Sequence, residues 1–122
     1  MKKPTILIVE DDAWIAEQHE RVLDRAGYRT VISPHAIAAI AAIDEVHPDA
    51  IILDVLLTGN TAFALLHELQ SYGDTSVIPI ILCTNLASDI AFDDVLPYGV
   101  RRILDKATME PDDIVAPVRS VL

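Results

Sequence analysis

Carboxylates follow two apolar runs of the sequence, at the point where each run ends. The run "ILIV" is followed by Glu10, Asp11 and Asp12, and the run "AIIL" is followed by Asp54. Acidic side chains that lie close together repel one another and lose hydration, so they stay ionised together only beside a positive charge. Oxygen ligands of this kind suit Mg²⁺, which takes few carboxylates, keeps waters and bridges to a phosphate. The acids therefore indicate a Mg²⁺ site.

A hydroxyl and an amine follow two further runs. Thr84 ends the run "IILCT", and Lys106 comes just after "RILD". A carboxylate beside a metal ion can attack phosphorus as a nucleophile, and a lysine and a hydroxyl opposite it suit the charge that develops on a phosphoryl group. Together these residues predict a phosphoryl-transfer site in which a side chain is the acceptor. A surface lysine is the alternative for Lys106, and its position after the last run disfavours that interpretation.

Simpler roles exist for several of these residues. Asp12 directly precedes an amphipathic pattern and is predicted to cap that helix rather than bind metal. Capping also fits Glu10 and Asp11, but two further acids exceed what one cap requires. Taken alone, Asp54 fits the start of a turn equally well, and Thr84 fits an ordinary strand residue. The interpretation of Asp54 as the phosphoryl acceptor depends on Glu10, Asp11 and Lys106 following their strands at the same edge of the sheet.

The elements that would position these groups are short apolar runs alternating with helical patterns. Helices are predicted from residue 13 to residue 26, over 36–46, over 62–69, near 88–96 and from residue 110, with Pro117 disturbing the last one. Strands that alternate with helices predict a parallel sheet covered on both faces. The predicted strands are Thr5–Val9, Arg29–Ile32, Ala50–Leu53, Val77–Cys83 and Val100–Leu104.

Five such units predict an α/β fold with a doubly wound, five-stranded parallel sheet of order 2-1-3-4-5, the flavodoxin-like (βα)5 arrangement. Ligands of such sheets bind at the carboxyl ends of the strands, near the switch point between the first and third strands. Glu10, Asp11, Asp54, Thr84 and Lys106 all follow strands at that edge. The fold therefore predicts that they share one crevice.

Composition limits the remaining possibilities. The chain has 122 residues with 52% hydrophobic content, which suits one domain over residues 1–122 with no output domain. The formal charge of −10, from 9 Lys+Arg against 19 Asp+Glu, argues against a nucleic-acid-binding surface. No apolar stretch is long enough for a signal peptide or a membrane span, so a cytoplasmic protein without membrane insertion is expected. Cys83 lies within an apolar run and is predicted to be a small buried hydrophobe.

The positions of the four histidines and of Trp14 do not indicate a second functional site. His19 lies in the apolar stripe of the first helix and is predicted to be packed and hydrogen-bonded. His67 falls off the stripe of its helix and should face water, and His35 and His47 flank a helix at the surface. No pair has zinc-ligand spacing with a third partner. Trp14 is expected to be partly buried near the rim of the pocket.

The segments "ILIVEDD", "AIILDVLLTG", "PIILCT" and "DK" in this order and spacing resemble a bacterial two-component response-regulator receiver domain of the stand-alone, single-domain type. The resemblance extends over the whole chain. It implies that Asp54 is the phosphoacceptor, loaded from a histidine kinase, a histidine phosphotransfer protein or a small phosphodonor. The other implied site residues are the metal ligands Glu10, Asp11 and Leu56 (through its backbone carbonyl), which act with Asp54, and the phosphate-binding switch residues Thr84 and Lys106.

The sequence departs from the usual pattern of that family at several positions. Ala107 follows Lys106 where a proline is usual, and Ile103 stands where an aromatic residue is common. Asn85 is larger than the residue that usually follows the threonine. We expect Asn85, Leu56 and Ile103 to modulate switching. None of these changes removes a reacting group, so the phosphorylation chemistry is expected to persist while the output surface is unusual.

The sequence thus predicts a phosphorylation-dependent switch of a two-component or phosphorelay system, acting on a downstream protein target. It is not expected to be an enzyme beyond self-catalysed phosphorylation and dephosphorylation of its own aspartate. A phosphorylation-independent interaction module on the same fold is the alternative. A flavin or dinucleotide site is disfavoured because acids, rather than glycines, follow the first strand. An aspartate-nucleophile phosphatase is disfavoured because Leu56 stands where its second catalytic acid is needed.

Overall fold

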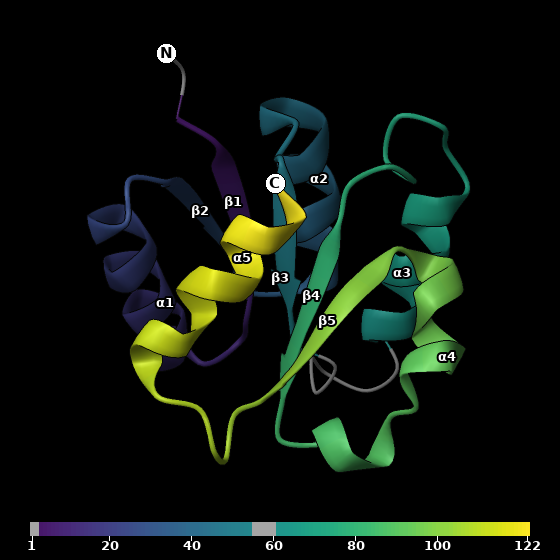
Figure 1. Ribbon diagram of the computed structural model, residues 1–122. Helices are drawn as coiled ribbons and strands as arrows, with labels where there is room; N and C mark the ends of the chain where they lie inside the picture. Colours follow the sequence, from purple (N-terminus) through teal and green to yellow (C-terminus); the bar gives the residue numbers. More distant parts are fainter. Residues whose placement is uncertain (1–2, 55–60) are drawn as a thin grey trace.

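The computed structural model describes residues 3–54 and 61–122, without the side chains of residues 61 and 62. Its centre is a five-stranded parallel sheet with the strand order β2-β1-β3-β4-β5, as Figure 1 shows. The predicted fold class and strand order are confirmed. The strands are β1 (Thr5–Val9), β2 (Arg29–Ser33), β3 (Ala50–Leu53), β4 (Ile80–Thr84) and β5 (Val100–Asp105).

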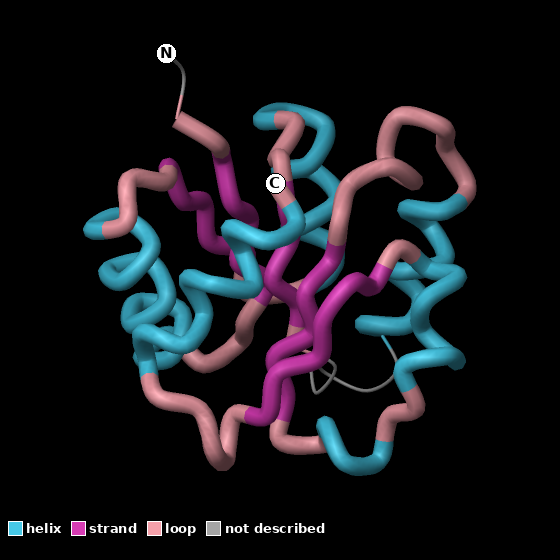
Figure 2. The backbone as a smooth tube through the Cα atoms, in the orientation of Figure 1, coloured by secondary structure: helices cyan, strands magenta, loops and turns pink. Residues whose placement is uncertain are grey.

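Helices cover both faces of this sheet. Figure 2 shows helices on both sides of the strands. Residues of α1 and α5 belong to the apolar cluster that contains Ile6 and Ile8, and residues of α2, α3 and α4 belong to the cluster that contains Leu7 and Val9. Burial on both faces explains why the first strand is apolar without alternation, as is usual for parallel sheets. The helices are α1 (Ala13–Arg25), α2 (Ala36–Val46), α3 (Thr61–Gln70), α4 (Phe92–Val95) and α5 (Val115–Val121). No helix of the described residues is long and apolar enough to cross a membrane.

Polar side chains cap the N-termini of α1 and α2. Oδ1 of Asp12 accepts hydrogen bonds from the backbone N–H groups of Trp14 and Ile15 at 3.0 and 3.2 Å, so the predicted cap of α1 is confirmed. Nδ1 of the exposed His35 accepts a hydrogen bond from the N–H of Ala38 at 3.1 Å and caps α2 in the same way. Both helices therefore begin where a side-chain acceptor satisfies their first N–H groups.

The fourth strand and the fourth helix differ from the sequence prediction. β4 begins at Ile80 and not at Val77, because Pro79 has no N–H to donate and Val77 is exposed. The single helix expected near residues 88–96 is wrong. The segment instead forms a 3-10 turn at Ala87–Asp89, the one-turn helix α4, and a second 3-10 turn at Leu96–Tyr98. The extended backbone at residues 90 and 91 separates the first turn from α4.

The last helix accommodates Pro117 by changing its geometry. It opens with a 3-10 turn over Pro111–Ile114, where Glu110 and Asp113 form a reciprocal capping box. The α-helical part begins at Val115, so the missing N–H of Pro117 falls in the first turn of α5, where its loss costs least. The expected kink or loose turn at Pro117 stays a prediction.

Two glycines adopt a backbone conformation that other residues avoid, and this gives a stability test. Gly27 and Gly99 have φ angles of 97° and 88°, and a Cβ on Gly99 would lie 3.1 Å from the side-chain nitrogen of Gln70. We expect Gly99→Ala to lower the free energy of unfolding by about 1–2 kcal/mol, and Gly27→Ala by somewhat less because nothing crowds its Cβ. Urea unfolding measures both. Gly73→Ala is the matched control, since Gly73 has neither a positive φ nor a close neighbour. An equal loss in all three variants would contradict this account.

Candidate functional site

The carboxyl ends of four strands meet at one edge of the sheet, the lower edge in Figure 1. Backbone hydrogen bonds extend the strand pairing by one residue there, from the N–H of Glu10 to Ser33, of Asp54 to Val9, and of Lys106 to Thr84, each at 3.1 Å. These bonds fix the first residue after β1, β3 and β5. The parallel pairing of the sheet therefore brings together residues that are nearly a hundred positions apart in the sequence.

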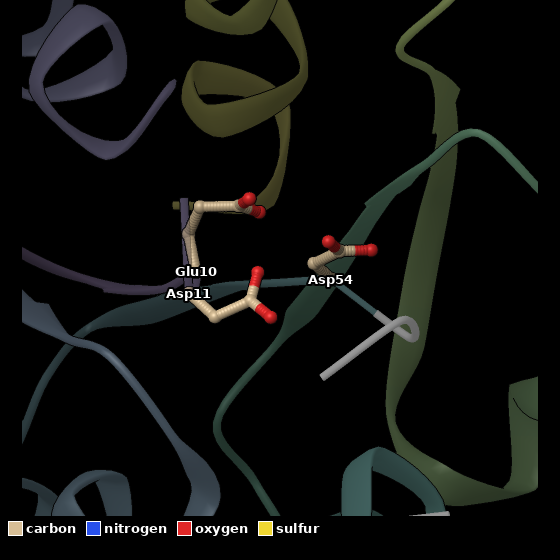
Figure 3. A group of neighbouring side chains, drawn as sticks. All are labelled: Glu10, Asp11 and Asp54. Carbon is tan, nitrogen blue, oxygen red and sulfur yellow. The ribbon is translucent and has the colours of Figure 1, made fainter. Parts of the chain in front are cut away.

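Three carboxylates form an acidic cluster at this edge, consisting of Glu10, Asp11 and Asp54. One oxygen from each lies within 4.8 Å of the others. Figure 3 shows Glu10 and Asp11 extending from the end of β1 toward the side on which Asp54 lies at the end of β3. Glu10 and Asp54 are each only 4% exposed, whereas Asp11 is open to solvent. A set of close, oxygen-only ligands with one open side could bind a hard divalent cation.

Lys106 bridges two members of the acidic cluster. Its Nζ donates to Oε2 of Glu10 at 2.7 Å and to Oδ2 of Asp54 at 2.8 Å, and all three side chains are at least nine-tenths buried. Charge-assisted bonds of this length are strong because the surroundings exclude water. The bridge links the ends of β1, β3 and β5 through one ammonium group.

The pKa values of the bridge follow from burial and pairing. Burial alone would lower the pKa of Lys106, but its hydrogen bonds to Asp54 and Glu10 outweigh burial and raise the pKa above its usual value. Burial raises the pKa of Glu10 to about 7, and the nearby Lys106 opposes this only in part. One ammonium therefore does not fully offset the cost of burying two carboxylates beside a third. The acidic cluster retains an affinity for further positive charge.

Thr84 and the loop after β4 form another side of the site. Thr84 is fully buried, and its Oγ1 accepts a hydrogen bond from the N–H of Leu86 at 3.1 Å. Asn85 between them is exposed. The hydroxyl of Thr84, which is expected to contact a phosphoryl group, is thus hydrogen-bonded to the backbone of the loop between β4 and α4.

The positions that depart from the family pattern have local structural roles. Ile103 is half-buried and packs against the core on the α2–α3 side of the sheet. The N–H of Ala107 donates to Oδ1 of Asp105 at 2.9 Å, a bond that a proline could not make. The described residues contain no cis peptide bond. Leu56, expected to be a metal ligand and a modulator, lies outside the described residues.

The surroundings of Trp14 and His19 differ from the prediction. Trp14 lines a pocket of about 270 Å³ that the three acids of the acidic cluster do not line, and it is 68% exposed, so the expected partial burial is wrong. His19 is buried, but among the described residues the one hydrogen-bond-like contact of its side chain is with Sγ of Cys83 at 3.9 Å. The same pocket is lined by Met109, which sequence analysis did not single out because nothing in its local sequence marks it. His67 is exposed, as predicted.

Comparison with known proteins agrees with this combination of fold and site. A doubly wound sheet with acids after β1 and β3 and a lysine after β5 is the arrangement expected of the receiver-domain class that the sequence resembles. The family model described as "Response regulator receiver domain" matches residues 6–119. The chain therefore belongs to the response regulator receiver domain family of two-component signalling proteins.

Curated relatives and solved structures support the same assignment. The chain is 33% identical over 118 residues to the phosphate regulon transcriptional regulatory protein PhoB of Pseudomonas aeruginosa, covering 97% of this chain and 51% of the relative. It is 32% identical to the DNA-binding response regulator MtrA of Mycolicibacterium paratuberculosis, with 96% and 50% covered. The chain thus spans about half the length of these relatives.

Two solved structures illustrate the likeness of the fold. A putative response regulator from Chloroflexus aurantiacus J-10-fl superposes with a TM-score of 0.83 at 32% identity, covering 98% of both chains. The chemotaxis response regulator CheY4 of Vibrio cholerae superposes with a TM-score of 0.88 at 22% identity, covering 99% of this chain and 100% of the other. The architecture is therefore that of receiver domains throughout the described residues.

The lysine bridge predicts a link between stability and divalent cations. Lys106→Met leaves Glu10 and Asp54 buried without their counter-charge, which we expect to lower the free energy of unfolding by about 3 kcal/mol in metal-free buffer. Millimolar Mg²⁺ should restore much of that loss and raise the melting temperature of this variant more than that of the wild type. Thermal unfolding with Mg²⁺ and with EDTA measures the difference. Lys3→Met removes an equal charge from an exposed site and should respond to Mg²⁺ like the wild type. If both variants respond alike, the bridge does not compete with the cation.

The buried histidine predicts a dependence of stability on pH. Burial lowers the pKa of His19 from 6.5 to about 4, with Lys106 adding to the effect, so the unfolded chain binds a proton there that the folded chain does not. The free energy of unfolding should therefore fall as pH decreases from about 6.5 to about 4, by roughly 3 kcal/mol at most from this residue. Urea unfolding of wild type and His19→Leu across this range isolates the effect as the difference between them. His47→Asn, which changes an exposed histidine, should keep the wild-type slope.

Proposed function

We propose that this domain is a phosphorylation switch in which Asp54 accepts a phosphoryl group, with Mg²⁺ bound by the acidic cluster. The donor is the phosphohistidine of a histidine kinase or of a histidine phosphotransfer protein, and the output is a changed surface that binds a downstream protein. The observation that carries the proposal is the placement of the Asp54 carboxylate, which lies within ligand distance of Glu10 and Asp11 and 2.8 Å from Nζ of Lys106.

The chemistry requires a carboxylate nucleophile that lies close to positive charge and is shielded from bulk water. Asp54 meets this requirement because it is nearly buried at the end of β3 and is paired with Lys106. One of its carboxylate oxygens attacks phosphorus, a P–O bond forms, the P–N bond to the donor histidine breaks, and the leaving nitrogen keeps the electron pair. Glu10, Asp11 and Asp54 would hold Mg²⁺, which would supply positive charge that offsets the negative charge of the reacting groups.

The remaining residues bind the product and transmit its presence. The ammonium of Lys106, which is already 2.8 Å from Asp54, pairs with a phosphoryl oxygen. The hydroxyl of Thr84 donates to another phosphoryl oxygen. Because Oγ1 of Thr84 also holds the N–H of Leu86, a move of this hydroxyl changes the loop after β4 and the exposed surface near α4. A phosphoryl group on Asp54 thereby shifts an equilibrium between two arrangements of the loop after β4.

In this proposal the domain catalyses only its own phosphorylation and dephosphorylation and turns over no external substrate. The net charge of −10 disfavours direct contact of this domain with nucleic acid, so the surface that changes is proposed to bind a protein. PhoB is named as a transcriptional regulatory protein and MtrA as a DNA-binding response regulator, and each is about twice as long as the part that matches this chain. DNA binding is therefore a property of those relatives.

Intact-mass spectrometry after brief incubation with acetyl phosphate or phosphoramidate and Mg²⁺ tests the proposal. The wild type should gain one phosphoryl group, about 80 Da, and the adduct should be absent without Mg²⁺ and in Asp54→Asn. Asp12→Asn is the matched control, because asparagine caps a helix as well as aspartate and Asp12 belongs to the N-cap of α1. This variant should be labelled like the wild type.

Two results would count against the proposal. No adduct on the wild type, under conditions that label another receiver domain, would favour a phosphorylation-independent interaction module. An adduct that persists in Asp54→Asn would show that another residue is the acceptor.

A further inference from the structure

Three soft metal-ligand side chains meet on the face of the sheet that α1 and α5 cover. Sγ of Cys83 in β4 lies 3.9 Å from Nε2 of His19 in α1 and 3.5 Å from Sδ of Met109, which follows β5. Cys83 is 1% and His19 is 6% exposed, and Met109 is partly buried. We call these three residues the soft-ligand cluster. It is separate from the acidic cluster, since no residue belongs to both.

Hydrogen bonding does not account for His19 at this position. Nδ1 of His19 is buried without a hydrogen-bond partner, one of two such side-chain atoms among the described residues. The contact of its Nε2 with sulfur is long for a hydrogen bond. Buried polar atoms are normally paired, so a buried imidazole held this loosely calls for an explanation. Because burial keeps this imidazole neutral at physiological pH, it carries a lone pair that can bind a metal ion.

The two contacts of the Cys83 sulfur are close to the distances between ligands of a three-coordinate metal ion. With metal–sulfur bonds of about 2.3 Å and a metal–nitrogen bond of about 2.0 Å, trigonal geometry separates sulfur from nitrogen by about 3.7 Å and the two sulfurs by about 4.0 Å. The 3.9 Å between Cys83 and His19 is already close to this value. The 3.5 Å between Cys83 and Met109 must lengthen by about half an ångström, which the unbranched and flexible side chain of Met109 allows.

The charge of the site selects the class of ion. A monovalent cation bound to the Cys83 thiolate gives a neutral unit, whereas a divalent cation would leave a net positive charge in a buried place. Thiolate and thioether sulfur favour soft ions such as Cu(I) over Mg²⁺ or Ca²⁺. We propose that the soft-ligand cluster of His19, Cys83 and Met109 binds Cu(I) or a chemically similar soft monovalent cation.

The ion can reach the cluster from solvent. A pocket of about 270 Å³ opens between α1 and the loop after β5, and His19 and Met109 are among its lining residues together with Trp14 and Lys106. Cys83 does not line the pocket but contacts both His19 and Met109. Binding forms the Cu–S bond and releases the thiol proton to solvent, with no change in the oxidation state of copper or sulfur. Because the proposal does not depend on phosphorylation of Asp54, it can be tested in the presence or absence of that chemistry.

Anaerobic titration of the Cu(I)–bicinchoninate complex with the protein tests the proposal. The wild type should withdraw one Cu(I) per chain and bleach the complex. Met109→Leu, which keeps the volume but removes the thioether, and His19→Leu should each weaken the affinity on the order of tenfold or more, and Cys83→Ala should abolish binding. Circular dichroism of each variant establishes that it is folded.

Two controls separate the soft-ligand cluster from other groups. His47→Asn removes an exposed histidine, and Asp54→Asn removes an acidic-cluster ligand, and both should bind Cu(I) like the wild type. In a second measurement, Ag(I) should raise the melting temperature of the wild type and of Asp54→Asn but not that of Cys83→Ala. The proposal is wrong if the wild type takes no Cu(I) from the chelator. It is also wrong if only Cys83→Ala reduces binding, because the thiol alone would then hold the ion.

Discussion

The interaction on which the site depends is the double ion pair of Lys106 with Glu10 and Asp54. Burying an ion pair costs several kcal/mol of hydration for each group, and the gain in Coulomb energy repays this only when the geometry is good. Here the geometry is set by backbone hydrogen bonds that extend three strands by one residue. The sheet therefore holds the carboxylates of Glu10 and Asp54 and the ammonium of Lys106 together at a site that is nearly inaccessible to water.

Much of this arrangement could be predicted from the sequence because the controlling patterns are local. The uninterrupted apolar run of β1 predicts a strand buried on both faces, and the acids after it must then lie at the carboxyl edge of a parallel sheet. Asp12 was predictable as a cap because it immediately precedes an amphipathic helix. Once the order of strands is known, Glu10, Asp54 and Lys106 fall into one crevice by the geometry of the fold alone.

The features that sequence analysis missed depend on tertiary contacts or on weak local signals. Val95 is the one buried residue of α4, so the sequence of this segment has no apolar stripe that would mark where the helix begins and ends. The backbone is extended at residues 90 and 91, which interrupts the helical segment. The start of β4 was placed too early because the apolar pattern continues through Pro79, although proline cannot donate a ladder hydrogen bond. The contact of Met109 with Cys83 joins residues that are 26 positions apart, and no spacing rule connects a methionine in a loop with a strand cysteine.

The hydrogen bond from Ala107 to Asp105 determines how the loop that carries Lys106 is kept in order. A proline at this position would restrict the backbone in the folded and the unfolded chain alike, and so would lower the entropy that folding removes. A hydrogen bond acts only in the folded chain, and it can open and close without any rotation about a peptide bond. The backbone on either side of the Lys106 side chain is therefore held by two hydrogen bonds, from the N–H of Lys106 to Thr84 and from the N–H of Ala107 to Asp105. Neither bond restricts the unfolded chain as a proline ring would.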